Sequence, residues 1–101
     1  MGLGSDGGLL VPERIPSLER NIRDLSGASY SELAFEIFKL YIDDIAESDL
    51  RQIVDKSYSN FSNSKVTPLV QVGEDYVLEL FHGPTLAFKD IALQFLGNVF
   101  E

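Results

Sequence analysis

With 101 residues the chain forms one small domain at most, and its net charge of −8, from 16 acidic and 8 basic residues, leaves no basic patch for nucleic acid or an anionic membrane surface. It has no cysteine, which excludes disulfides and thiolate metal sites, and one histidine, which excludes a multi-histidine metal site within the chain. No apolar run reaches the ~20 residues that span a membrane, so we expect a cytoplasmic protein that binds no metal, nucleic acid or membrane.

The first quarter of the chain predicts loops and one short helix. Residues 1–8 are rich in glycine, serine and aspartate, which favour turns. Residues 9–11 predict a short strand or an extended segment that the following proline ends. Ser17 is expected to cap a short helix over residues 18–25, which a Ser-Gly pair ends.

Two amphipathic helices follow, as a candidate antiparallel hairpin linked at Asp43-Asp44. Ser29 with Glu32, and Asp44 with Glu47, have the spacing of capping boxes that start helices. Apolar residues then recur at the helical period. The expected buried stripes are Tyr30, Leu33, Ala34, Ile37, Phe38 and Tyr41 in the first helix and Leu50, Ile53, Val54 and Tyr58 in the second, with Phe61 beyond it.

The rest of the chain predicts a β-hairpin and an apolar helix. After a polar loop over 57–65, strands are expected over 66–72 and 76–81, joined by a Gly-Glu-Asp turn. A final helix is expected to begin between residues 85 and 89, with almost no polar face, so it must be buried. This predicts a homo-oligomer through the C-terminal helix; the alternative is a monomer in which the helix folds back on the helical hairpin.

Residues 81–90, FHGPTLAFKD, carry the clearest chemical signal. Lys89 follows an apolar strand and opens an apolar helix. Burial and the partial positive charge of a helix start both favour the neutral amine, which is a nucleophile that can form a Schiff base. The alternative is a lysine that pairs with a carboxylate or extends its ammonium group to water.

Residues 81–101, FHGPTLAFKDIALQFLGNVFE, resemble the segment around the pyridoxal-phosphate (PLP) lysine of threonine synthases, enzymes of the tryptophan-synthase β type. DGGLLVP at 6–12, SELAFEI at 31–37 and VTPLV at 66–70 resemble further family segments in the same order. Since family members have several hundred residues, the chain is expected to be an N-terminal portion. Its expected fold is α+β, with a helical hairpin, a small antiparallel β-hairpin and an apolar C-terminal helix, as the truncated N-terminal domain of an α/β PLP enzyme. Residues 1–80 would form the N-terminal domain, and 81–101 would start the PLP-binding catalytic domain.

The resemblance implies conversion of O-phospho-L-homoserine and water to L-threonine and phosphate, with PLP as electron sink. Lys89 would anchor PLP and act as catalytic acid and base. Phe88 would pack on the cofactor ring, or else be an ordinary core aromatic residue. Because the loop that holds the PLP phosphate lies far downstream in this enzyme class, the 101 residues alone are expected to be inactive.

The remaining residues of the segment have two interpretations each. Thr85 would lie at the carboxylate end of the substrate, or cap the helix. His82 would contact substrate or relay protons, or else form a backbone hydrogen bond at the strand end. Gly83-Pro84 reads as a rigid turn, and Asp90 as a structural residue that caps the helix, pairs with a basic group or orders the lysine.

Two other functions fit the same sequence. One is a threonine-synthase-like lyase that acts on phosphorylated hydroxy-amino acids, which shared N-terminal motifs do not distinguish from the synthase. The other is a non-enzymatic interaction module with an acidic surface.

Overall fold

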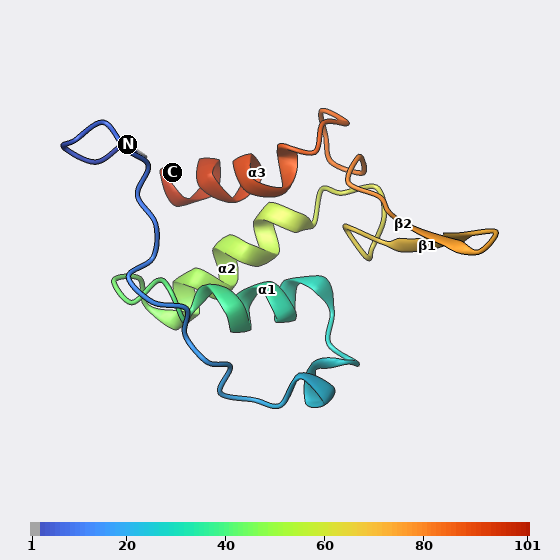
Figure 1. Ribbon diagram of the computed structural model, residues 1–101, viewed down its shortest axis with the longest axis horizontal. Coiled ribbons are helices and arrows are strands. Elements are labelled where there is room, and N and C mark those ends of the chain that lie inside the picture. Colours follow the sequence, from blue (N-terminus) through green and yellow to red (C-terminus); the bar gives the residue numbers. More distant parts are fainter. Residues whose placement is uncertain (1–2) are drawn as a thin grey trace.

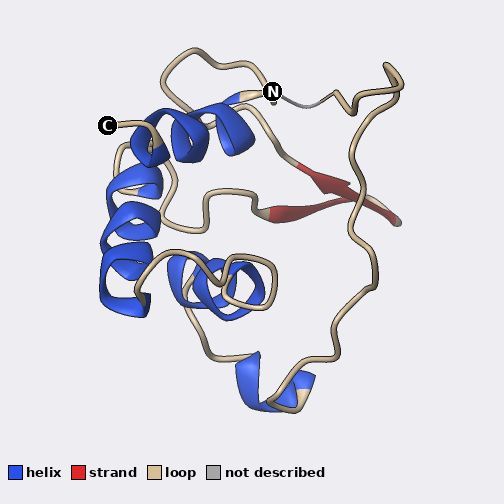
Figure 2. Cartoon of the chain, turned by 90° about the vertical axis from the view of Figure 1, so that its left-hand side faces the viewer, coloured by secondary structure: helices blue, strands red, loops and turns tan. Residues whose placement is uncertain are grey.

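A computed structural model describes residues 3–101. Three α-helices pack together with α2 in the middle, and a two-stranded hairpin projects from one end of them (Figures 1 and 2). The expected α+β fold is therefore confirmed. The elements in chain order are the 3₁₀ helix η1 (Ile22–Leu25), α1 (Tyr30–Phe38), α2 (Glu47–Tyr58), β1 (Leu69–Val72), β2 (Asp75–Leu78) and α3 (Asp90–Val99).

The segment before α1 has less helix than expected. Residues 9–11 are extended, with one isolated bridge from Leu9 to Leu3. The helix expected over 18–25 is only the short η1, and its cap is Asn21, whose side chain accepts from the Arg23 amide. The expected cap at Ser17 is wrong, because Asn21 satisfies the first free amide four residues later.

The first capping box forms as expected. Ser29 Oγ accepts from the Glu32 amide and the Glu32 carboxylate accepts from the Ser29 amide, each at 3.2 Å. The predicted buried stripe, however, omits Phe35, which is 2% exposed. The guanidinium of Arg51 lies 4.0 Å from the centre of the Phe35 ring, so a charged side chain from α2 covers this ring.

The second capping box is wrong. Helix α2 starts after Ala46, and no side chain bonds its first amides, although Glu47 and Asp49 in the first turn favour a helix start electrostatically. Residues 39–46 join α1 to α2, a longer link than Asp43-Asp44 alone. The stripe of α2 is confirmed at Leu50, Val54 and Tyr58, which are all buried.

The hydrophobic core lies between the helices. Phe38 of α1 and Phe95 of α3 are in contact, with ring centres 4.5 Å apart and ring planes tilted by 51°. Helix α3 thus folds back on α1 and α2, as one of the two expected arrangements requires. The buried core consists of Ala34, Phe35, Leu50, Val54, Tyr58, Phe61 and Val66, with Tyr30, Phe38, Ile42, Ile45, Ile91 and Phe95 packed against it.

Helix α3 also has a polar stripe, in contrast to the predicted helix with almost no polar face. Asp90, Gln94 and Asn98 follow one another at intervals of four and lie on one face. Asn98 donates to the buried hydroxyl of Ser57 at 3.0 Å, and Ser57 donates to the Ile53 carbonyl at 2.6 Å. This face gives α3 a fixed polar contact with α2.

The hairpin is shorter than expected. Strands β1 and β2 pair antiparallel, with Leu69 opposite Leu78 and Val72 opposite Asp75. Gly73 turns the chain at φ 62°, which suits glycine. No helix within residues 3–101 is long and apolar enough to cross a membrane.

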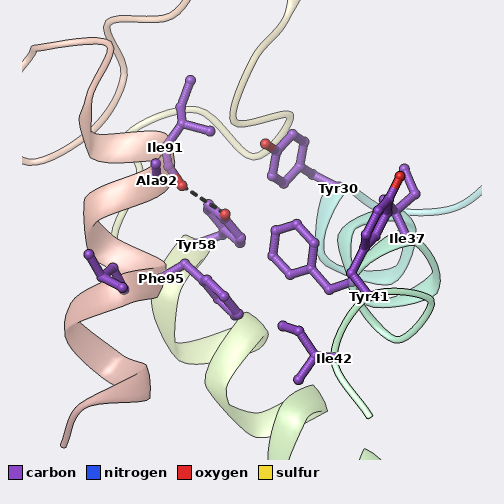
Figure 3. A pocket seen from close by; sticks show the side chains of 10 residues that line it. Tyr30, Ile37, Tyr41, Ile42, Tyr58, Ile91, Ala92 and Phe95 are labelled. Carbon is purple, nitrogen blue, oxygen red and sulfur yellow. Dashed lines mark hydrogen bonds between the residues drawn. The ribbon is translucent and has the colours of Figure 1, made fainter. Parts of the chain in front are cut away.

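The clearest polar tie between α2 and α3 is Tyr58. Its hydroxyl donates to the Ile91 carbonyl at 2.8 Å, in the first turn of α3 (Figure 3). Burial raises the pKa of Tyr58, and Tyr30 adds to that rise, so the hydroxyl remains a protonated donor.

We expect Tyr58→Phe to lower the free energy of unfolding by about 0.5–1.5 kcal/mol, the net value of a buried hydrogen bond, without loss of fold. Urea denaturation followed by circular dichroism measures this. Tyr41→Phe is the matched control, because Tyr41 is exposed, and it should leave the transition unchanged. Equal effects from the two variants would contradict the role of the Tyr58 hydroxyl.

Candidate functional site

The predicted site residues lie in the turn between β2 and α3. Lys89 is the residue immediately before α3, so the helix starts one position later than the expected range of starts. The structure is therefore consistent with Lys89 at a helix N-terminus, where free backbone amides and the helix dipole provide partial positive charge.

The Lys89 side chain is exposed, so the expected burial of this lysine is wrong for the residues described. Within residues 3–101 no carboxylate lies in salt-bridge range of its amine. An open hollow of about 520 Å³ is lined by Phe88, Lys89, Ile91, Ala92 and Leu93. Lys89 thus borders a mostly apolar surface that is open to a ligand.

Phe88 is not a core residue. Its side chain is 65% exposed and contributes to the same hollow as Lys89. The alternative of an ordinary core aromatic is therefore wrong for these residues. An exposed ring next to a free amine offers a flat apolar surface for a ring-shaped ligand.

Asp90 holds the turn together through its carboxylate. Oδ2 accepts from the Thr85 amide at 2.8 Å and from the Thr85 hydroxyl at 2.9 Å. Oδ1 accepts from the Gln94 amide nitrogen at 3.2 Å. Asp90 is only 2% exposed, and it links the turn to the first helical turn.

These hydrogen bonds determine the ionisation of Asp90. Burial raises the pKa of the carboxyl group, but the hydrogen bonds from Thr85, Gln94 and the Leu86 backbone outweigh it. The pKa of Asp90 is therefore lowered, and the carboxylate is the stable form in the folded chain.

The backbone of the turn fits closely around this carboxylate. A Cβ atom added at Gly83 would overlap the Cβ and the carboxylate of Asp90, so only glycine fits there without displacement. Leu86 has φ 66°, a left-handed conformation that costs a residue with a Cβ atom roughly 1–2 kcal/mol. The Leu86 amide donates to the Gly83 carbonyl at 3.1 Å and closes the turn.

Thr85 does not cap α3 with its side chain. Its hydroxyl donates to Asp90, and the residue at the cap position is Lys89, with no side-chain cap bond. The sequence analysis does not predict the bond between Thr85 and Asp90. A hydroxyl residue five positions before an aspartate, on either side of a turn, is the signal that could have found it.

His82 is occupied by other partners. Its Nε2 lies 2.9 Å from Glu79 Oε1, and its carbonyl accepts from the Ser62 amide at 2.9 Å. The imidazole therefore bonds a carboxylate rather than the backbone that the alternative interpretation expects, and only the main-chain carbonyl of His82 takes part in a backbone bond. The ring bonds Glu79 and none of Thr85, Phe88 and Lys89.

A second hollow, of about 620 Å³, lies between the three helices and is nearly all apolar (Figure 3). Aromatic and aliphatic side chains point into it, and its only polar side-chain atoms are tyrosine hydroxyls. Its residues are Tyr30, Ile37, Phe38, Tyr41, Ile42, Tyr58, Ile91, Ala92, Phe95 and Leu96. It offers an apolar docking surface but no acid or base near neutral pH.

The chain is similar to threonine synthases over nearly all of its length. The sequence profile of a family described as threonine synthase N terminus matches residues 1–58. The chain is 49% identical to threonine synthase of Saccharomyces cerevisiae over 99% of its own length and 21% of that protein.

Solved structures give the same match. The crystal structure of PLP-bound threonine synthase from Brucella melitensis has a TM-score of 0.89 and 43% identity, over 97% of this chain and 22% of that one. The yeast threonine synthase structure has a TM-score of 0.89 and 47% identity, over 98% of this chain and 21% of that one. The chain therefore spans about a fifth of the length of these relatives.

The lowered pKa of Asp90 predicts a pH dependence of the turn. A carboxylate whose folded-state pKa is below the ordinary 3.8 contributes its full stability above that value and loses it as the pH falls through the folded-state pKa. We expect the NMR signal of the Thr85 amide to be constant near neutral pH and to shift only below about pH 4. In Asp90→Asn this acid shift should disappear, whereas Asp55→Asn, at an exposed position on α2, should retain it. An acid shift that persists in Asp90→Asn would contradict the assignment.

Proposed function

This chain belongs to the threonine synthase family, and we propose that it is the N-terminal part of an enzyme that converts O-phospho-L-homoserine and water to L-threonine and phosphate with PLP. The observation that carries the proposal is the free amine of Lys89 at the start of α3, in a segment that resembles the lysine segment of the family. In this proposal residues 1–80 form the N-terminal domain and residues 81–101 begin the PLP-binding domain. The chain alone is expected to be inactive, since it spans about a fifth of its relatives.

The residues present fit the aldehyde end of PLP. An exposed amine without a carboxylate partner can condense with an aldehyde, and the adjoining Phe88 ring can pack on a flat heterocycle. When bound, PLP supplies an electron sink for bonds at the substrate Cα and Cβ. Lys89 would hold the cofactor and, once released, accept and return protons near the substrate Cα.

Thr85 and His82 are proposed to face the substrate. The proton of the Thr85 hydroxyl is engaged by Asp90, so in this conformation its oxygen would accept a hydrogen bond from a substrate group rather than donate one. The His82 imidazole, bonded to Glu79, keeps one ring nitrogen for a substrate contact or a proton relay. A cytoplasmic location stays a prediction from the sequence.

The exposed apolar side of α3 is proposed to be covered in the whole enzyme by the rest of its chain. Leu93, Leu96 and Phe100 are about half exposed or more, and the relatives are about five times as long as these 101 residues. Apolar patches of this kind mark contact surfaces.

Replacing Lys89 tests the proposal directly. In the full-length enzyme we expect Lys89→Ala to abolish both turnover and the visible absorbance of lysine-bound cofactor, because a methyl group has no amine to offer. Lys89→Arg should fail equally, since a guanidinium remains protonated. Lys65→Ala, at another exposed lysine, is the control and should retain activity. Normal turnover by purified Lys89→Ala would refute the proposal. Assay of the unmodified enzyme for threonine and 2-oxobutanoate separates the synthase from the lyase alternative.

Helix α3 folds back on α1 and α2, but its outer face stays exposed, so the isolated 101-residue chain is still expected to form homo-oligomers through that face. Leu93 is 53% exposed and Phe100 is 80% exposed, and burial of each large apolar side chain contributes about 1.5–3 kcal/mol. Light scattering over a concentration series should therefore show a mass that rises with concentration. Leu93→Gln combined with Leu96→Gln should shift the mass toward the monomer, whereas the same change at Leu69, on the hairpin, should not. A strict monomer at high concentration would count against association.

A further inference from the structure

Asp90 is the one buried charged side chain in the described part of the chain. Removing a carboxylate from water is unfavourable unless hydrogen bonds replace the lost solvation. Two donors from Thr85 and one from Gln94 do so here. A residue that needs three partners to be accommodated, next to the proposed catalytic lysine, calls for a specific role.

The contacts of Asp90 lie on both sides of Lys89. Thr85 is five residues before Asp90 in the turn, and Gln94 is one helical turn after it in α3. The carboxylate therefore joins the turn to the helix across the peptide that carries Lys89. Lys89 has a flexible side chain of four methylene groups. The position of its amine therefore depends on how firmly its backbone is held.

The backbone conformation of the turn from Gly83 to Lys89 also depends on the Asp90 carboxylate. Gly83 leaves space that the Asp90 side chain fills, and Leu86 takes a left-handed conformation between them. Strained backbone of this kind persists only where surrounding contacts determine it fully. Asp90 supplies such contacts, because its side chain packs against Gly83 and its carboxylate accepts hydrogen bonds from Thr85, the residue before Leu86.

We propose that Asp90 is a positioning residue for Lys89: its buried carboxylate fixes the turn from Gly83 to Lys89 and so the place from which the amine reaches its ligand. The proposal rests on the proposed function of Lys89, and it adds a residue that never touches substrate or cofactor. Asp90 acts through geometry, because its oxygens bond Thr85 and Gln94 and leave the Lys89 amine without a carboxylate partner.

Three variants of the full-length enzyme test the proposal. Asp90→Ala removes every acceptor, and we expect kcat to fall about 10- to 100-fold, the usual result of a displacement of about 1 Å. KM should rise as well, because Thr85, which is proposed to face the substrate, loses both of its bonds to Asp90. Asp90→Asn keeps an oxygen that can accept from Thr85, so it should recover most of kcat. Asp55→Ala, an exposed aspartate of α2, is the matched control and should match the unmodified enzyme.

A second readout does not depend on turnover. The enzyme is mixed with PLP and reduced with borohydride at short times, and the labelled peptide is quantified by mass spectrometry. Asp90→Ala should label Lys89 more slowly than the unmodified enzyme, whereas the final extent of labelling and the helical circular dichroism signal remain the same. If Asp90→Ala does not fold, Gln94→Met, which removes one donor to the carboxylate, should show the same kcat loss and slower labelling to a smaller degree.

The outcomes separate the two proposals. A folded Asp90→Ala enzyme with unchanged kcat and labelling rate overturns the positioning role and leaves the role of Lys89 intact. Parallel losses in kcat and in folded fraction, with the remaining folded enzyme fully active, also overturn it. Labelling that never maps to Lys89 in the unmodified enzyme shows that the proposed function has failed.

Discussion

The docking of α3 on α2 determines where Lys89 lies, because Lys89 is the residue from which α3 starts. Apolar packing provides most of the energy: each buried large side chain contributes about 1.5–3 kcal/mol, against about 0.5–1.5 kcal/mol for a hydrogen bond. Packing alone would tolerate small slides of one helix along the other. The bonds from Tyr58 to the Ile91 carbonyl and from Asn98 to Ser57 tie the first and last turns of α3, and so they select one register.

The three faces of α3 have three different surroundings. Ile91 and Phe95 pack on the core, while Asp90, Gln94 and Asn98 form the polar stripe that meets the turn and Ser57. Lys89 and Leu93, four residues apart, share a third face that the described chain leaves open. The residues that hold the helix are therefore separated from the residue proposed to react, and a partner can cover the open face without disturbing the core.

Local signals in the sequence predict part of the structure, whereas contacts between distant residues are predicted poorly. The caps expected at Ser17 and at Asp44 are absent, because Asn21 and Ala46 hold the cap positions. The Ser29–Glu32 capping box needs only four consecutive residues and is present. The guanidinium of Arg51, sixteen residues away, covers the ring of Phe35, and no periodicity reveals a charged side chain in that place. The strands are shorter than the predicted ranges 66–72 and 76–81 because hairpin residues without a second layer gain little from extension.

For the candidate site, the sequence predicts the position of Lys89 but not its surroundings. The position of Lys89 before a helix follows from the composition of the segment, but its exposure does not, because an apolar helix was taken to imply surroundings that 101 residues do not supply. The polar stripe of α3 is hard to detect in the sequence because its three members are spread among apolar residues at intervals of four. In a helical projection they form one line, and that line identifies Asp90 as part of a contact rather than as a lone charge.

A carboxylate directly beside a lysine would ordinarily be expected to hold its amine in an ion pair. Here consecutive helical positions point about 100° apart, so the side chains of Lys89 and Asp90 diverge from their common backbone. The Asp90 oxygens are already occupied by Thr85 and Gln94, which leaves the lysine no strong acceptor on its own turn. The carboxylate of Asp90 accepts its hydrogen bonds from Thr85 and Gln94 and needs none from Lys89. Asp90 can therefore fix the backbone of Lys89 and leave its amine available to react. Gly83, Thr85 and Asp90 are thus physically coupled. Gly83 has no side chain and leaves the space that the Asp90 side chain fills, and the Asp90 carboxylate accepts hydrogen bonds from the amide and hydroxyl of Thr85.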